Sequence, residues 1–233
     1  MQEDRIIVKE QVLQRDMYYK EQLVLSYTVK YPQFISDMFR GFLKELNLYY
    51  KMNALRYVHF NIGRLYRLAV EEYENSVAND FPVRAYEVLT DYTVTYNRNC
   101  TLSLYFDRYE YTGGAHGNTV RSSDTWNLQA EREMELGDLF SDGNYREYVI
   151  RQILEQIEAD ISAGNDYYFD NYNDLVNEYF NIRNFYLDGE GIVIYFQQYE
   201  IAPYASGIRT FTIPYQQKVY CYCSQPVYAT CFL

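Results

Sequence analysis

Alternation of apolar and polar residues predicts two strands at the start of the chain. Apolar side chains occupy alternate positions at Ile6 and Val8, and again from Leu23 to Tyr31, which is the period of a strand with one buried face. Because proline donates no backbone hydrogen bond, Pro32 is expected to end the second strand. The segment from Arg5 to Tyr31 is therefore expected to be β-structure.

A helical period follows, from Ser36 to about Tyr73. Its apolar residues recur every three or four positions, and they are Phe39, Phe42, Leu43, Leu46, Tyr49, Tyr50, Ala54, Tyr57, Leu65, Leu68 and Ala69. Ser36 is expected to cap the helix. Gly63 marks a bend or interruption, since glycine costs about 1 kcal/mol in a helix interior. His59 is interpreted as a structural histidine, because no second histidine or acidic motif accompanies it.

The middle of the chain predicts three further strands. Runs rich in Val, Thr and Tyr cover residues 84–97 and 101–111, and the Asn97-Arg98-Asn99 turn between them predicts a hairpin. Residues 119–128 form the next alternating run.

A glycine-rich loop lies between the second and third of these strands. Gly113, Gly114 and Gly117 indicate backbone with positive φ or a close approach by another group. Tyr111 and His116 belong to the same loop, and Tyr111, Gly113, Gly114 and His116 are candidate binding residues. His116 is interpreted mainly as a residue that holds the loop by bonding to backbone, since a single histidine is a weak catalytic signal.

The last third of the chain predicts a second long helix and a small sheet. Asn144 is expected to cap the helix, with Glu147 as its reciprocal partner, and Gly164 to end it. The remaining elements expected from the pattern are a short helix over 175–179, a hairpin of 185–187 with 192–196, and a strand over 208–213.

These elements predict an α+β fold in which antiparallel sheet is packed by one long helix in the N-terminal half and by a second helix in the C-terminal half. Two segments are expected, residues 1–108 and 109–233. The sequence alone leaves open whether they form two subdomains or one continuous sheet.

Charge narrows the classes of partner. The net charge is −11 and 23% of the residues are charged, which argues against nucleic acid or an anionic membrane as the main partner. A negative net charge instead favours a cationic partner. The alternative is that the charge serves only to keep the protein soluble. The 29 tyrosines suit strands and are also enriched at interfaces.

The spacing of the cysteines and the hydropathy of the chain bear on two questions, which are its cellular location and its ability to bind a metal. Cys221, Cys223 and Cys231 lie close together in the sequence, and Cys100 is distant from them. The three either form a local disulfide or remain free thiols, and the spacing leaves both alternatives open. Their spacing is not that of a zinc site, and no metal or cofactor is expected. No apolar run is long enough for a membrane span, and the first residues do not resemble a signal peptide.

An acidic aromatic loop is the first binding candidate. Residues 166–174 contain Tyr167, Tyr168, Asp170 and Tyr172. Tyrosine provides contact area at low entropic cost, and the carboxylates suit a cationic partner. Calcium is an alternative, although the spacing of the aspartates is not that of an EF-hand. An exposed acidic loop without a ligand is the other interpretation.

The second binding candidate follows a predicted buried strand. Tyr199, Glu200 and Tyr204 surround a Pro-containing corner. They form either a binding edge or a packed corner, and proline is ordinary at the end of a strand.

A catalytic alternative rests on His116 alone. It would serve as general base of a hydrolase, oriented by Glu110, Asp124 or Glu200. No Ser or Cys lies in a nucleophile-elbow pattern, however, and no metal motif is present. We therefore expect no enzymatic activity.

Four stretches together resemble a known family. They are Tyr111-Thr-Gly-Gly-Ala-His-Gly-Asn-Thr119, Glu135-Leu-Gly-Asp-Leu-Phe140, Phe185-Tyr-Leu187, and Ile192 to Gly207 with its Tyr-Glu-Ile-Ala-Pro-Tyr run. Their order resembles domain of unknown function 3298, which is usually preceded by domain of unknown function 4163. The RsiV anti-sigma factor and the PdaC peptidoglycan deacetylase of Gram-positive bacteria carry these domains. The N-terminal strand–helix–strand segment is similar to the preceding domain in layout.

The resemblance implies a non-catalytic, extracytoplasmic binding module. In the anti-sigma branch this domain binds lysozyme, so the implied partner is a cationic muramidase or cell-wall glycan. The implied location is extracellular or at the cell surface, with an export segment outside this numbering. A structural envelope protein without activity is the remaining alternative.

Overall fold

The computed structural model describes residues 6–141, 143–165 and 167–215. Its strands are β1 (Ile7–Tyr19), β2 (Gln22–Ile35), β3 (Tyr86–Arg98), β4 (Thr101–Tyr111), β5 (Asn118–Asn127), β6 (Arg132–Glu133), β7 (Phe185–Leu187), β8 (Gly191–Phe196) and β9 (Arg209–Pro214). Its α-helices are α1 (Arg40–Tyr57), α2 (Gly63–Ala78), α3 (Tyr145–Ser162) and α4 (Tyr172–Tyr179). A π-helical turn (Val58–Ile62) and two short 3₁₀ helices (Leu136–Leu139 and Tyr204–Ser206) complete the described elements.

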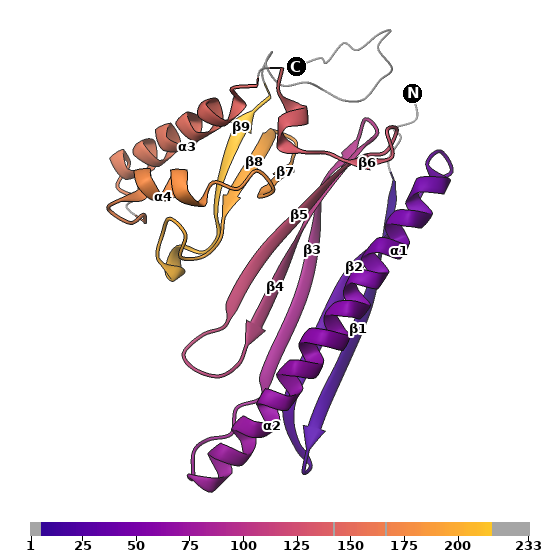
Figure 1. Cartoon of the computed structure of the whole chain (residues 1–233), viewed down its shortest axis with the longest axis vertical. Coiled ribbons are helices and arrows are strands. Elements are labelled where there is room, and N and C mark those ends of the chain that lie inside the picture. Colours follow the sequence, from indigo (N-terminus) through magenta and orange to yellow (C-terminus); the bar gives the residue numbers. More distant parts are fainter. Residues whose placement is uncertain (1–5, 142, 166, 216–233) are drawn as a thin grey trace. The chain divides into compact units, whose positions relative to one another are not determined.

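The fold is α+β, as the sequence predicts (Figure 1). One sheet has the order β1-β2-β3-β4-β5-β6 and the other the order β7-β8-β9. The chain divides into two compact units. The N-terminal unit contains residues 6–92 and 106–120, and the C-terminal unit contains 93–105 and 121–215 of the described residues. Strands β3, β4 and β5 therefore each contribute residues to both units.

In the N-terminal unit, β1 and β2 form a long antiparallel hairpin. Lys20 and Glu21 make its turn with φ of 45° and 65°, the backbone that a tight two-residue hairpin requires. The prediction that Pro32 ends the second strand is wrong: β2 continues to Ile35, which pairs with Ile7. The parallel pairing of β2 with β3 covers only residues 25–29 of β2, so a proline at position 32 removes no bond on that edge.

The helix begins later than the sequence suggests, at Arg40 rather than after Ser36. The Ser36 hydroxyl instead accepts a hydrogen bond from the Met38 amide at 3.3 Å, in the turn that precedes the helix. Asp37 pairs with Arg40 at 2.7 Å. The polar residues therefore shape the approach to the helix without capping it.

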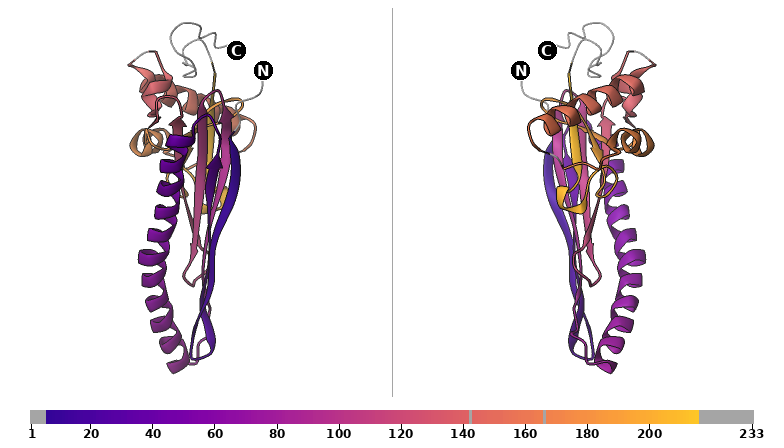
Figure 2. Two further views of the ribbon diagram at one scale, coloured as in Figure 1. Left: turned by 90° about the vertical axis from the view of Figure 1, so that its right-hand side faces the viewer. Right: turned by 90° about the vertical axis from the view of Figure 1, so that its left-hand side faces the viewer.

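From Arg40 to Ala78 the chain is helical throughout, with a π-helical turn in the middle. Gly63 begins α2 directly after this turn. Figure 2 shows the long helix beside the strands of its own unit. Ile62, Leu65 and Ala69 are buried against β2 and β3. A helix between β2 and β3 also explains why these strands pair in parallel, because parallel neighbours need a crossover connection.

In the C-terminal unit, α3 packs against β9 of the small sheet β7-β8-β9, and α4 packs against α3 (Figure 1). Val149, Ile153 and Ile157 of α3 are fully buried in one core with strand residues such as Ile194 and Phe211. Each such side chain contributes roughly 1.5–3 kcal/mol through burial. As predicted, α3 begins after Asn144, although the Asn144 side chain makes no capping bond to it. Gly164 follows the end of α3 with φ of 84°.

Two expectations fall partly or wholly outside the described residues. Asp166 of the acidic loop and the three C-terminal cysteines, Cys221, Cys223 and Cys231, lie outside them. In the part of the chain that the structure describes, no helix combines the length and apolarity that crossing a bilayer requires.

Candidate functional site

The glycine-rich loop belongs to the N-terminal unit. Gly113 and Gly114 have φ of 89° and 88°, so both use the positive-φ backbone that the sequence predicted. Arg84, which is not part of the loop, stabilises it: its guanidinium donates a hydrogen bond to the Gly114 carbonyl at 3.0 Å. The Tyr111 hydroxyl donates to the same carbonyl at 3.2 Å. Tyr111 therefore holds the loop rather than projecting freely from it.

His116 lies exposed on this loop. Its Nδ1 is 2.9 Å from the Gly117 carbonyl oxygen, which is the backbone contact of a structural histidine. Gly117 itself is buried, and a Cβ there would come within 2.4 Å of the Tyr109 ring. Glu110, one of the carboxylates considered as a partner for His116, accepts a hydrogen bond from the Tyr57 hydroxyl at 2.7 Å. Burial, and then this carboxylate, raise the pKa of Tyr57 well above its ordinary value.

A cavity that the sequence did not reveal lies in the same unit. Its volume is about 480 Å³, and it is lined by Arg64, Leu65, Leu68, Glu71, Glu72, Asn75, Tyr86, Glu110 and Thr112. The lining residues come from α2, from β3 and β4, and from the start of the glycine-rich loop, which are far apart in the sequence. Burial, and next the charges of Glu72 and Glu71, raise the pKa of Tyr86. This depression therefore presents more carboxylates than cations.

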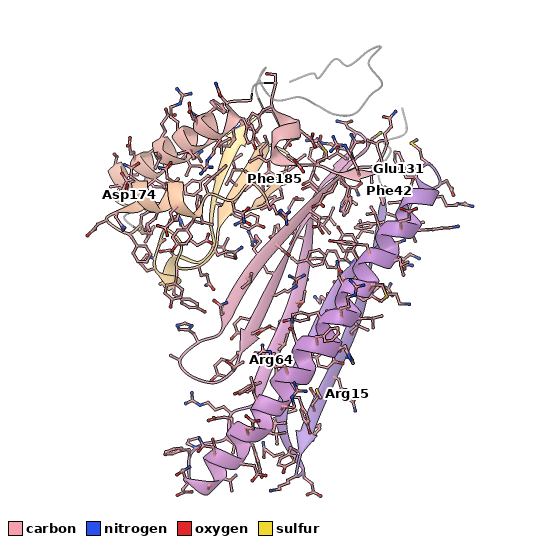
Figure 3. The ribbon with its side chains drawn as sticks, viewed as in Figure 1. Arg15, Phe42, Arg64, Glu131, Asp174 and Phe185 are labelled. Carbon is pink, nitrogen blue, oxygen red and sulfur yellow. The ribbon has the colours of Figure 1, made fainter. Side chains whose placement is uncertain are left out.

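The acidic aromatic loop belongs to the C-terminal unit, and its last part is helical. α4 begins at Tyr172, three residues before the predicted helix. Tyr167 is 53% exposed, and Asp170 and Asp174 are exposed as well. Asp174 is labelled on α4 in Figure 3. These three side chains are free to meet a partner.

Tyr168 differs from its neighbours because it is buried. Its hydroxyl donates to the Asp160 carboxylate at 2.7 Å and accepts a hydrogen bond from Arg209. Arg209 also pairs with Asp160 at 3.3 Å. Tyr168 thus connects the loop to α3 and β9, and Tyr172 packs near it with ring centroids 6.3 Å apart.

The corner after β8 is tightly folded. Tyr199 has φ of 69°, unusual for a bulky residue, and the residue is 53% exposed. It lies against the Tyr204 ring, with centroids 5.6 Å apart. Glu200 turns back and accepts a hydrogen bond from the Gln197 amide at 2.6 Å, so its carboxylate supports the corner.

The structure brings the acidic loop and this corner together. The Ser206 hydroxyl donates to the Tyr167 carbonyl at 3.0 Å, and the Phe169 amide donates to the Ile201 carbonyl at 3.1 Å. We call the resulting surface the acidic tyrosine surface; it consists of Tyr167, Asp170, Asp174, Tyr199 and Tyr204. The sequence predicted the two segments but not the hydrogen bonds that join them, since the segments are separated along the chain.

A pH-dependent effect is expected at Glu200. Burial raises the pKa of this carboxyl group above its ordinary 4.5, and the Gln197 amide offsets part of the effect. The folded state therefore binds the proton of Glu200 more tightly than the unfolded state does, so the contribution of this group to stability is largest below pH 4.5 and is lost as the pH rises through the raised pKa. Glu200→Gln keeps an acceptor for the Gln197 amide and removes the charge.

We expect the midpoint of thermal unfolding of Glu200→Gln, relative to the parent, to rise between pH 4 and pH 7. Glu178→Gln, which changes an exposed carboxylate on α4, is the control and should show no such trend. Equal behaviour of the two variants in a pH series of melting curves would contradict this assignment.

Among the described residues, no group of three or more His, Cys, Asp and Glu side chains is arranged to hold a metal ion. The acidic tyrosine surface therefore offers separate carboxylates and aromatic rings. Such a surface suits recognition of positive charge and of flat apolar faces, since carboxylates attract cations and tyrosine rings provide contact area.

Comparison with known proteins adds two family matches and a fold. Residues 19–119 match the family described as Deacetylase PdaC, and residues 137–216 match Protein of unknown function (DUF3298). No curated protein sequence matches the chain.

Two crystal structures of DUF3298 family proteins share the fold. One, from Bacteroides fragilis, is 19% identical with a TM-score of 0.69, and the alignment covers 94% of this chain and 96% of that one. The other, from Pseudomonas aeruginosa, is 13% identical with a TM-score of 0.59, and the alignment covers 91% and 92%. At these identities the likeness concerns the fold alone.

Proposed function

Because the chain joins a segment of the PdaC family to a segment of the DUF3298 family, we propose that it is a non-catalytic binding module of the bacterial envelope. The proposed location is outside the cytoplasm, where PdaC-type domains typically act. Its proposed partner is a cationic protein of the muramidase type. The acidic tyrosine surface is the observation that carries this proposal.

The chemistry of that surface supports a cationic protein as partner. Tyr167 and Tyr199 are each 53% exposed, and exposed tyrosines are typical anchors of protein interfaces. Asp170 and Asp174 place two exposed carboxylates on the same loop and helix. The net charge of −11 would also accelerate the encounter with a cationic protein.

The geometry of His116 supports a role without catalysis. Its Nδ1 lies at hydrogen-bond distance from the Gly117 carbonyl, within a loop that Arg84 and Tyr111 also hold. His116→Ala is therefore expected to leave partner binding intact. Hydrolysis of cell-wall material by the parent, lost in this variant, would favour the hydrolase alternative.

Titration with hen egg-white lysozyme tests the proposed partner. We expect saturable binding by calorimetry that weakens between about 50 and about 300 mM salt, because surface charges are screened at the higher concentration. Tyr167→Ala and Tyr199→Ala should each raise Kd about ten-fold, a typical effect at an aromatic interface anchor.

Tyr18→Ala is the matched control, because Tyr18 is 56% exposed and belongs to the other unit. Its Kd should equal that of the parent. The proposal of a cationic protein partner fails if lysozyme does not bind at high micromolar concentration. Binding of soluble peptidoglycan fragments that depends on Tyr167 and Tyr199 would then identify glycan as the partner.

A further inference from the structure

The outer face of α1 is apolar along its centre. Leu48, Met52 and Leu55 recur with the spacing i, i+4 and i+7, so they share one face of the helix. They are 60%, 38% and 39% exposed, whereas Leu46 and Tyr50 on the opposite side are buried. The helix therefore has a second apolar face that stays largely exposed in the described residues, although Leu48 also lines a small cavity with residues of β1 and β2.

Phe60 extends this face beyond α1. It lies in the π-helical turn between α1 and α2 and is 68% exposed, the largest value among the exposed large hydrophobic residues. Figure 2 shows the long helix with the strands of its own unit on one side only. A helix packed on a sheet ordinarily has polar residues on its far side, so the exposed apolar residues require another explanation.

Basic side chains flank the apolar centre. Lys44, Lys51, Arg56 and Arg67 are all exposed, and no ion pair involves them in the described residues. Residues 40–70 contain six basic residues and one acidic residue, a local net charge of +5. The whole chain has a net charge of −11, so positive charge is concentrated in this part of the long helix, before Glu71, Glu72 and Glu74 near the end of α2.

An apolar centre with basic flanks is the pattern of helices that lie on anionic membranes. We propose that this face, consisting of Lys44, Leu48, Lys51, Met52, Leu55, Arg56 and Phe60 and called the basic helix surface, rests on an anionic lipid bilayer. The basic groups would lie near the lipid phosphates, and the apolar side chains would enter the interface. The inference does not depend on the acidic tyrosine surface, which belongs to the other unit.

The apolar residues favour lipid over a soluble polyanion. A soluble polyanion would need only cationic side chains to bind. Exposed Leu48 and Phe60 lower the free energy of the complex only where they leave water, as they do at a lipid interface. The overall negative charge does not prevent this contact, because salt screens charges beyond about 10 Å. The attraction is therefore set mainly by the local basic residues, each of which contributes about five-fold in partition near an anionic surface.

Vesicle sedimentation with the full chain tests this proposal. Phosphatidylcholine vesicles containing about 30% phosphatidylglycerol should sediment the protein, and vesicles of phosphatidylcholine alone should not, because binding needs the negative surface potential. Binding should also weaken as salt is raised.

Two paired substitutions separate the parts of the basic helix surface. Lys51→Glu/Arg56→Glu should lower the partition coefficient at least ten-fold. Leu48→Ser/Phe60→Ser should lower it about ten-fold while all charges remain. Arg151→Glu/Arg183→Glu is the control: it makes the same change in charge on exposed residues of the other unit and should change partition less than two-fold.

Circular dichroism confirms that each variant folds, and Lys51→Gln/Arg56→Gln replaces the charge reversal if that pair does not. Absence of sedimentation with anionic vesicles at low salt overturns the proposal. So does equal loss of binding in the control pair, which would indicate general electrostatics. Unchanged partition of Leu48→Ser/Phe60→Ser, together with binding to heparin, would identify a soluble polyanion as the occupant instead.

Discussion

Replacement of Gly191 by alanine is expected to lower the midpoint of thermal unfolding by about 10 °C, corresponding to about 3 kcal/mol. Gly191 begins β8 and pairs with Pro214 of β9. A Cβ at this position would lie 2.2 Å from the Ile213 carbonyl oxygen and 3.0 Å from the Pro214 Cα. Because both contacts are with backbone, no side-chain rotation relieves them, and β9 must move.

Gly189→Ala provides the matched control two residues earlier in the same turn. A Cβ at Gly189 meets only the Arg98 guanidinium, at 4.0 Å, so its stability should change by less than about 0.5 kcal/mol. Thermal melts followed by circular dichroism compare the two variants. Similar midpoints for both would show that the close approach of β8 and β9 does not constrain position 191.

Ser103→Ala is expected to destabilise the protein by about 2–3 kcal/mol. Ser103 is fully buried on β4. Its hydroxyl lies 2.7 Å from the Thr125 hydroxyl of β5 and accepts a hydrogen bond from the Leu187 amide of β7 at 2.9 Å. Alanine would leave two buried polar groups without these partners, and chemical denaturation measures the cost.

A double-mutant cycle distinguishes this mechanism from simple loss of packing. Thr125→Val removes the other hydroxyl of the pair, so the double variant with Ser103→Ala should lose less than the sum of the two single effects. Strict additivity would mean that the two hydroxyls do not interact. The cycle therefore tests the hydrogen bond itself.

The regular elements could be predicted because their periodicity reflects burial. The stripe of Val149, Ile153 and Ile157 predicts α3, and all three are buried in its core. Two of the mistakes, at Pro32 and Ser36, have identifiable causes. For Pro32 the deciding factor is the extent of the β2–β3 pairing, which joins strands far apart in the sequence. For Ser36 it is the turn in which its hydroxyl accepts a hydrogen bond from the Met38 amide, two residues away.

The candidate site was predictable only as separate segments. Tyr167 and Tyr168 are adjacent and chemically identical, yet one is exposed and the other is buried against Asp160 and Arg209. Which of the two tyrosines is buried depends on where α3 and β9 place Asp160 and Arg209. The residue type alone does not predict this. In contrast, Gly113 and Gly114 were predictable, because positive φ is a property of the residue itself.

The strands β3, β4 and β5 supply residues to both units, and this has an evolutionary consequence. A chain whose modules are joined by a linker can exchange one module by recombination without altering the other. In this chain the crossover would have to preserve the strand residues that both units use. The two units are therefore expected to be inherited as one block, with substitutions along the three strands accepted only when both units tolerate them.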